Sequence, residues 1–274
     1  MKKKISVVDI RNCRETRQKY SMVTGYDYTT ATIINASDVN MILVGDSLGM
    51  VMMGYDSTVP VTMDDMLHHI RAVVKGAPQT FVAGDMPFGS YNVSLEQAVA
   101  NTNRLMKEGG CDCVKLEGGL EMVDTIRAIV RAGIPVMGHI GLTPQTVSAM
   151  GGFKVQGKSR EAADRLVQAA QAIETAGAFM LVVEGVPAVV GKAITNAITI
   201  PTMGIGAGLD CDCQILILQD MLGMYDKFTP KFVKQCANLR EIMISALGTF
   251  HSEVQSSAFP TPEYAYNTEV DGLE

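Results

Sequence analysis

Eight short hydrophobic runs recur along the chain, and most are apolar almost throughout rather than alternating with polar positions. They occupy residues 21–27, 41–47, 80–86, 113–119, 135–141, 179–185, 200–208 and 214–222. Near-continuous apolar runs of this length are typical of parallel strands that are covered on both faces. The pattern therefore predicts a parallel sheet with strands at these positions.

Segments of helical character separate the runs. Ser94 and Ser159 are suited to N-cap two of them, and Gly177 is suited to end the second. Strands that alternate with helices predict an α/β fold, a (β/α)8 TIM barrel, with an open doubly wound sheet as the alternative. The gap between the last two strands is too short for a full helix. The expected helices cover residues 63–75, 94–108, 121–132, 159–176 and 187–195.

Length and composition are compatible with one such barrel. The chain has 274 residues, 47% of them hydrophobic and 19% charged, and we expect a single barrel domain over 1–274. A C-terminal tail from about 254 to 274 is rich in Pro, Ser and aromatic residues; docking onto the body or a neighbouring subunit and partial disorder are both open.

Charge and hydropathy exclude two classes of partner. The net charge is −6 and no basic cluster is present, which argues against nucleic-acid binding. No run reaches the roughly 18–20 apolar residues of a membrane span, and the N-terminal segment lacks the apolar core of a signal peptide. We expect a cytoplasmic protein.

Two further motifs suggest sites, but their spacing argues against both. Two Cys-Asp-Cys pairs, at 111–113 and 211–213, have one residue between cysteines, whereas zinc sites have two to four. In a barrel these pairs would also begin opposite strands, so buried, reduced cysteines are favoured. The glycines of GIGAG (204–208) do not match G-x-G-x-x-G, and a glycine-lined rim is favoured over a dinucleotide site.

Ionisable residues end most of the predicted strands. In a parallel barrel the carboxyl ends of all strands open onto one face, where active sites of this fold lie. A single acid at such a position is commonly a helix cap, but six strands bringing charge or imidazole to one rim indicate a site. The residues are Asp27, Asp46 with Ser47, Asp85, Lys115 with Glu117, His139 and Glu184.

The residue types narrow the chemistry of this site. Asp46, Asp85 and Glu117 come from neighbouring strands and would repel one another without a cation, which favours a hard divalent ion such as Mg²⁺. Lys115 either holds an anionic substrate or neutralises the acids, and the two roles are compatible. Glu184 follows a very apolar run, where burial would raise its pKa and suit a general base.

Several segments closely resemble the ketopantoate hydroxymethyltransferase family. They are MVTGYDYTTA, ILVGDSLGMVMMGYDSTVPVTMDDM, AGDMPFGSY, VKLEGG, MGHIGLTPQ, GGFKVQGK and MGIGAG, in order over about residues 3–260. The resemblance implies a barrel of the phosphoenolpyruvate/isocitrate-lyase type, Mg²⁺ as cofactor and a homodecamer. It also implies transfer of a hydroxymethyl group from 5,10-methylenetetrahydrofolate to 3-methyl-2-oxobutanoate, giving 2-dehydropantoate for pantothenate and coenzyme A biosynthesis.

The resemblance also assigns roles residue by residue. Asp46 and Asp85 would ligate the metal, Glu117 would do so directly or through water, and Glu184 would be the base. The keto acid would contact Asp46, Ser47, Asp85 and Lys115, with His139 beside it. Lys154, Lys158 and Arg160 either meet the folate carboxylates or form a solvated loop. The sequence departs from the family pattern at Gly25, Ser148 and Cys213, and none of these residues is a proposed catalytic group.

Two rival functions follow from other readings of the same barrel. One is another metal-dependent 2-oxo-acid lyase of the superfamily; such relatives often carry a Lys-Cys-Gly-His loop, which does not occur here. The other is a non-catalytic barrel that binds a keto acid or folate, which would not need both a metal set and a separate base.

Overall fold

The structure is a computed structural model that describes residues 2–268. The chain divides into two compact units: residues 1–218 with 230–233, and residues 219–229 with 234–274. The second unit includes residues before 254, among them part of a long helix with no buried residue. The single barrel domain with a tail from about residue 254 stays a prediction. Residues 269–274 of the expected tail lie outside the described residues.

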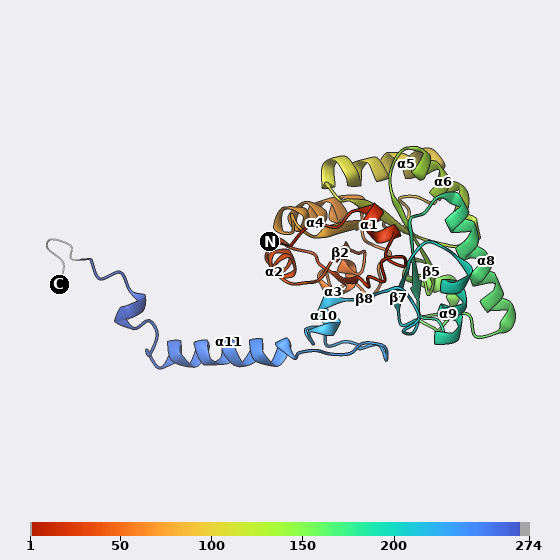
Figure 1. Cartoon of the computed structure of the whole chain (residues 1–274). Helices are drawn as coiled ribbons and strands as arrows, with labels where there is room; N and C mark the ends of the chain where they lie inside the picture. The colour runs from red at the N-terminus through yellow and green to blue at the C-terminus, as the bar shows by residue number, and fades with distance from the viewer. Residues whose placement is uncertain (1, 269–274) are drawn as a thin grey trace. The chain divides into compact units, whose positions relative to one another are not determined.

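The first unit contains eight parallel strands in a closed barrel, each hydrogen-bonded to its neighbours in chain order (Figure 1). Closure confirms the predicted barrel and excludes the open sheet. Each strand lies within one of the eight predicted hydrophobic runs, except that β8 begins one residue earlier. The strands are β1 (Ser21–Thr24), β2 (Met41–Val44), β3 (Phe81–Asp85), β4 (Cys113–Glu117), β5 (Val136–Gly141), β6 (Met180–Glu184), β7 (Thr202–Ile205) and β8 (Cys213–Leu216).

In the first unit, the longer helices lie on the outside of the barrel (Figure 1). Ser94 and Ser159 cap the N-termini of α5 and α8, and Gly177 ends α8 in the left-handed conformation, as predicted. The sequence pattern did not predict α2 or α11. The helices are α1 (Val7–Arg11), α2 (Tyr28–Ala36), α3 (Leu48–Val51), α4 (Met63–Gly76), α5 (Leu95–Arg104), α6 (Val123–Arg131), α7 (Val147–Met150), α8 (Arg160–Ala176), α9 (Ala188–Ala197), α10 (Leu218–Met221) and α11 (Leu239–Gln255).

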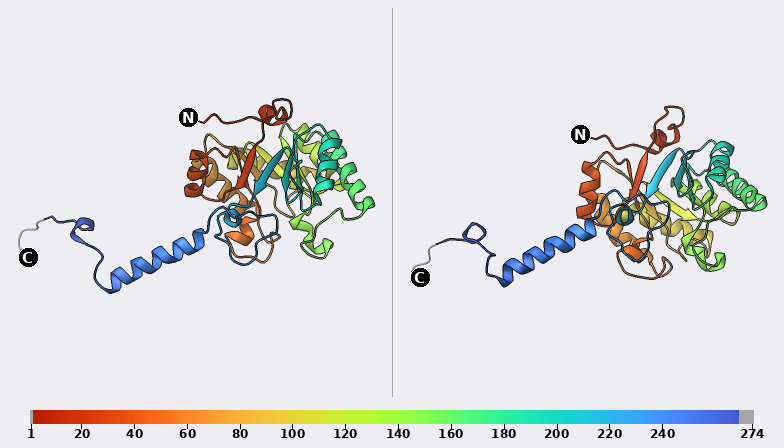
Figure 2. Two further views of the ribbon diagram at one scale, coloured as in Figure 1. Left: turned by 60° about the horizontal axis from the view of Figure 1, so that its bottom comes forward. Right: turned by 90° about the horizontal axis from the view of Figure 1, so that it is seen from below.

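The barrel interior is filled by large apolar side chains. Met22, Met41 and Phe81 from the first three strands belong to one buried cluster with Met180 and Met203 from strands across the barrel. The cluster extends into the N-terminal segment around α1, which Figure 2 shows at one end of the strands. That end is therefore closed by packing, and the carboxyl ends of the strands are left to form a site.

The connection between β7 and β8 is irregular, as predicted. Residues 206–212 contain no helix, so GIGAG does not open onto a helix N-terminus of the kind that a dinucleotide site uses. A Cβ built at Gly208 would lie 2.6 Å from the Cβ of Ala188. Glycine is thus required here by close packing against α9.

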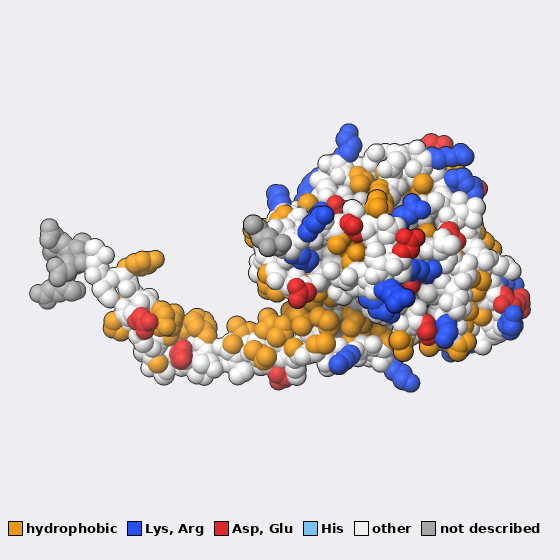
Figure 3. Space-filling view, in the orientation of Figure 1, with side chains coloured by type: hydrophobic (Ala, Val, Ile, Leu, Met, Phe, Trp, Pro, Cys, Tyr) orange, Lys and Arg blue, Asp and Glu red, His pale blue; other side chains and the backbone are white. Residues whose placement is uncertain are grey.

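The second unit contains the 17-residue helix α11, which has no buried residue. Its apolar side chains include Leu247, 66% exposed, and Phe250, 53% exposed. Figure 3 shows a row of hydrophobic atoms along this helix. Within residues 2–268, no helix is long and apolar enough to cross a bilayer.

Candidate active site

The carboxyl ends of β3 and β4 place an acid and a lysine side by side. Asp85 and Lys115 are register partners on these strands, and both side chains are almost fully buried. The Lys115 ammonium donates to both carboxylate oxygens of Asp85, each at 2.7 Å. Burial opposes a charge on Lys115, but Asp85 and Glu117 outweigh it and raise the pKa of the ammonium.

Glu117 lies on the same face of β4 as Lys115, as their two-residue spacing requires. Its Oε1 is 3.6 Å from the Lys115 ammonium, and its Oε2 accepts the backbone N–H of Gln145 at 3.0 Å. Burial alone would raise the pKa of Glu117, but Lys115 and His139 outweigh it and keep that pKa below its ordinary value. Glu117 is therefore held as a carboxylate.

His139 lies between two carboxylates. Its Nδ1 is 3.3 Å from Glu117 Oε1 and its Nε2 is 3.2 Å from Glu184 Oε2, within ion-pair range although neither contact has the geometry of a well-aligned hydrogen bond. Burial and Lys115 oppose a charge on the ring, but the two carboxylates raise the pKa of His139 to about 9. His139 thus links Glu184, whose side chain is 15% exposed, to the buried cluster.

Asp46 follows β2 and is 4% exposed. Its backbone N–H donates to Asp85 Oδ2 at 3.2 Å, which brings the two acids together. Burial, and then the neighbouring Asp85 and Glu117, raise its pKa well above the ordinary value. The cluster therefore holds more negative charge than Lys115 neutralises.

Gln145 is a member of the site to which the sequence gave no role. Its side-chain amide donates to Asp46 Oδ2 at 2.9 Å and to the backbone oxygen of Met86 at 2.8 Å. Its Oε1 accepts from the Tyr91 hydroxyl at 2.6 Å. Gln145 belongs to the GLTPQ motif after β5, and that motif was the only signal that could have identified it.

Three other residues that the sequence singled out, Ser47, Asp27 and Arg160, have other hydrogen-bond or ion-pair partners. Ser47 follows Asp46, and its hydroxyl is 2.8 Å from the hydroxyl of Tyr26, a second residue that the sequence did not indicate. Asp27 caps α2 by accepting the N–H of Thr30 at 2.8 Å, which is the ordinary role of an acid after a strand. Arg160 is exposed and paired with Asp164 at 2.9 Å.

The donor set suits a hard cation that takes only part of its ligands from the protein. The described residues contain no group of three or more His, Cys, Asp or Glu side chains that could hold a metal ion by themselves. Mg²⁺ commonly uses one or two carboxylates and completes its shell with water and substrate. Asp46 and Asp85, with the raised pKa of Asp46, fit that pattern.

A family model described as ketopantoate hydroxymethyltransferase matches residues 4–262. The chain belongs to this family. It is 53% identical over 275 residues to the 3-methyl-2-oxobutanoate hydroxymethyltransferase of Heliobacterium modesticaldum, with 100% of both chains covered. It is 54% identical to the enzyme of the same name from Enterococcus faecalis, with 99% of this chain and 98% of the relative covered.

Solved structures with little sequence similarity share the fold. A phosphonopyruvate hydrolase in complex with oxalate and Mg²⁺ superposes with a TM-score of 0.62 at 10% identity, covering 94% of this chain and 93% of that one. A 2,3-dimethylmalate lyase, described as a member of the PEP mutase/isocitrate lyase superfamily, has a TM-score of 0.58 at 14% identity, covering 95% and 92%. These likenesses show that the barrel fold is shared.

Proposed function

We propose that this chain transfers a hydroxymethyl group from 5,10-methylenetetrahydrofolate to 3-methyl-2-oxobutanoate and forms 2-dehydropantoate. The family membership supports the activity. The observation that carries the chemistry is the buried Lys115–Asp85 pair with His139 and Glu184 on the following strands. Removal of a proton next to a carbonyl requires a general base, and the partly exposed Glu184 carboxylate can serve as one. The Lys115 ammonium can hold the anionic substrate.

Asp46 and Asp85 would hold Mg²⁺, which would stabilise negative charge on the keto oxygen of the substrate as a Lewis acid. Glu117 would complete the acidic set directly or through water, with its two oxygens facing Lys115, His139 and the N–H of Gln145. This assignment keeps every buried acid beside at least one positive or N–H group.

The protein side chains would then carry out the proton transfer. Lys115 orients the substrate carboxylate, and Ser47 contacts it from the turn between β2 and α3. Glu184 removes the proton from C3, and His139 holds the Glu184 carboxylate in place at 3.2 Å. The resulting carbon nucleophile attacks the methylene carbon of the folate in its opened iminium form, so that a C–C bond forms as the C=N π bond breaks. Water then replaces the remaining C–N bond: its hydroxyl stays on the methylene carbon as the hydroxymethyl group on C3, and its proton leaves on the nitrogen of the released tetrahydrofolate.

A turnover assay with methylenetetrahydrofolate and 3-methyl-2-oxobutanoate tests the activity, and we expect 2-dehydropantoate as product. Full turnover after exhaustive chelation would contradict the role of the metal. Cleavage of a 2-oxo-acid substrate without folate would favour the superfamily lyase instead.

Proton exchange at C3 tests the base separately, because it needs no folate. In deuterated buffer we expect Glu184→Gln to slow the exchange by at least about 100-fold, since the amide keeps the shape of the side chain but accepts no proton. The exposed Glu96→Gln on α5 is a matched control that should exchange at the wild-type rate. Wild-type exchange in Glu184→Gln would show that another group is the base.

A further inference from the structure

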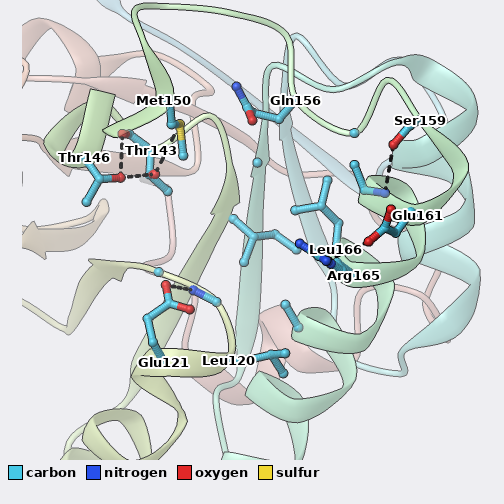
Figure 4. A pocket seen from close by; sticks show the side chains of 17 residues that line it. Leu120, Glu121, Thr143, Thr146, Met150, Gln156, Ser159, Glu161, Arg165 and Leu166 are labelled. Carbon is cyan, nitrogen blue, oxygen red and sulfur yellow. Dashed lines mark hydrogen bonds and ion pairs between the residues drawn. The ribbon is translucent and has the colours of Figure 1, made fainter. Parts of the chain in front are cut away.

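A cavity of about 500 Å³ is lined by 17 residues, which Figure 4 shows. Its lining includes Gly118, which directly follows Glu117, and Ile140, which directly follows His139. The cavity therefore begins one residue beyond Glu117 and one residue beyond His139. A molecule bound in it would border the keto-acid site.

The walls of the cavity suit a partly apolar ligand. Leu120, Ile140 and Leu166 supply apolar surface, and Leu120 is 52% exposed. Gly119 and Ala169 face each other closely: a Cβ built at Gly119 would lie 3.3 Å from the Cβ of Ala169. Glycine is therefore needed where this wall packs closely against α8.

Acidic groups lie on both walls of the cavity, and Arg165 lies on the α8 wall beside Glu161. Glu121, on the connection after β4, is fixed because its Oε1 accepts the N–H of Gly119 at 2.7 Å. Arg165 is on α8 and pairs with Glu161 of the same helix at 2.7 Å. Figure 4 shows Glu121 on the wall opposite α8. A carboxylate accepts two parallel N–H bonds, and a guanidinium donates to carboxylates.

We propose that this cavity binds 5,10-methylenetetrahydrofolate, with the donor edge of the pterin on Glu121 and the carboxylate tail towards Arg165. The pyrimidine edge of a pterin carries adjacent N–H donors, which match a carboxylate, and its glutamyl tail is anionic. The methylene carbon belongs to the pterin end of the molecule and must meet C3 of the keto acid. The shared border at Gly118 and Ile140 allows this.

This assignment differs from the basic residues that the sequence indicated. The loop before α8 contributes Gln156, Gly157 and Ser159 to the cavity lining. The Arg160 side chain is 90% exposed and paired with Asp164. The proposal rests on the proposed function, since that reaction is what brings a folate to the site.

Two substitutions test the cavity without touching the keto-acid site. Glu121→Gln keeps the bond to Gly119 but removes the charge, and Ala162→Leu fills space on the α8 wall with an equally helix-compatible residue. We expect each to raise the KM for methylenetetrahydrofolate, and the Kd for tetrahydrofolate measured by anaerobic calorimetry, at least about tenfold. The KM for the keto acid and the rate of C3 exchange should stay within twofold of wild type.

Asp124→Asn is the matched control, because this acid lies near Glu121 in sequence but does not line the cavity and pairs with Arg127. It should leave both folate constants unchanged. Unchanged tetrahydrofolate affinity in both cavity variants would overturn the proposal. Absence of turnover or C3 exchange in the wild type would instead overturn the proposed function. Retained exchange in a variant shows that it is folded, so a raised Kd is not due to misfolding.

Discussion

At the scale of single residues, the site is organised by groups that satisfy each other's charge. Lys115 neutralises Asp85, and His139 lies between Glu117 and Glu184. Gln145 supplies neutral donors to Glu117 and Asp46. An amide does this without adding a charge that would compete with a metal ion.

We expect Gln145→Leu to weaken Mg²⁺ binding by about 10- to 100-fold, as loss of groups that orient metal ligands commonly does. The substitution removes the donors to Asp46 and the Met86 carbonyl and keeps a similar volume. Calorimetric titration with Mg²⁺ measures the effect. Gln156→Leu, on the loop before α8, is the control; equal Mg²⁺ affinity in wild type and Gln145→Leu would show that the amide does not position the ligands.

At the scale of elements, a side chain near the end of α8 links this helix to the segment between α9 and β7. Glu174, near the end of α8, accepts from the Thr199 backbone N–H at 2.7 Å and from the Ile200 N–H at 3.1 Å, just before β7. Burial would raise the pKa of Glu174, but the hydrogen bonds from Thr199 and Ile200 outweigh it and lower that pKa. The charged form is therefore bound more favourably in the folded state than in the unfolded chain.

This linkage predicts a pH-dependent contribution to stability. Because the folded-state pKa is lowered, the contribution is fully present above the ordinary glutamate pKa and is lost as the pH falls through the folded-state value. Glu174→Gln should lower the free energy of unfolding by about 1 kcal/mol at neutral pH. Urea titrations over a pH series measure it, and the wild-type advantage should shrink at acidic pH; a constant difference would contradict the charge-based explanation.

The strand positions, the barrel and the rim residues could be predicted, because parallel buried strands have a distinctive hydrophobic pattern and one rim collects their carboxyl ends. Helices α2 and α11 could not. The first, YTTATIINA, is rich in β-branched residues with low helix propensity. The second presents apolar residues that no other part of the described chain covers.

At the scale of the whole molecule, α11 has apolar side chains that remain exposed in the described chain. Large exposed apolar surfaces commonly mark interfaces. The homodecamer implied by the sequence resemblance stays a prediction. In such an assembly, a second copy of the chain would cover the apolar surface of α11.

We expect the double variant Leu247→Glu/Phe250→Glu to reduce the assembly from about ten chain masses to smaller species. Charges at these exposed apolar positions would have to be desolvated in an interface. Light scattering during size-exclusion chromatography measures the mass. Thr249→Glu, at a polar position of the same helix, is the control; an unchanged mass in the double variant would show that α11 is not part of the interface.

The sequence by itself determined where the strands lie and which ionisable residues end them, because burial and strand period are local properties of the chain. It also placed Lys115 and Glu117 on one face of one strand. Only the tertiary structure decided which groups meet: Lys115 with Asp85 across a strand pair, and Gln145 with Asp46 from a loop 99 residues away. These contacts depend on barrel register and loop conformation, which are set by the packing of the whole fold.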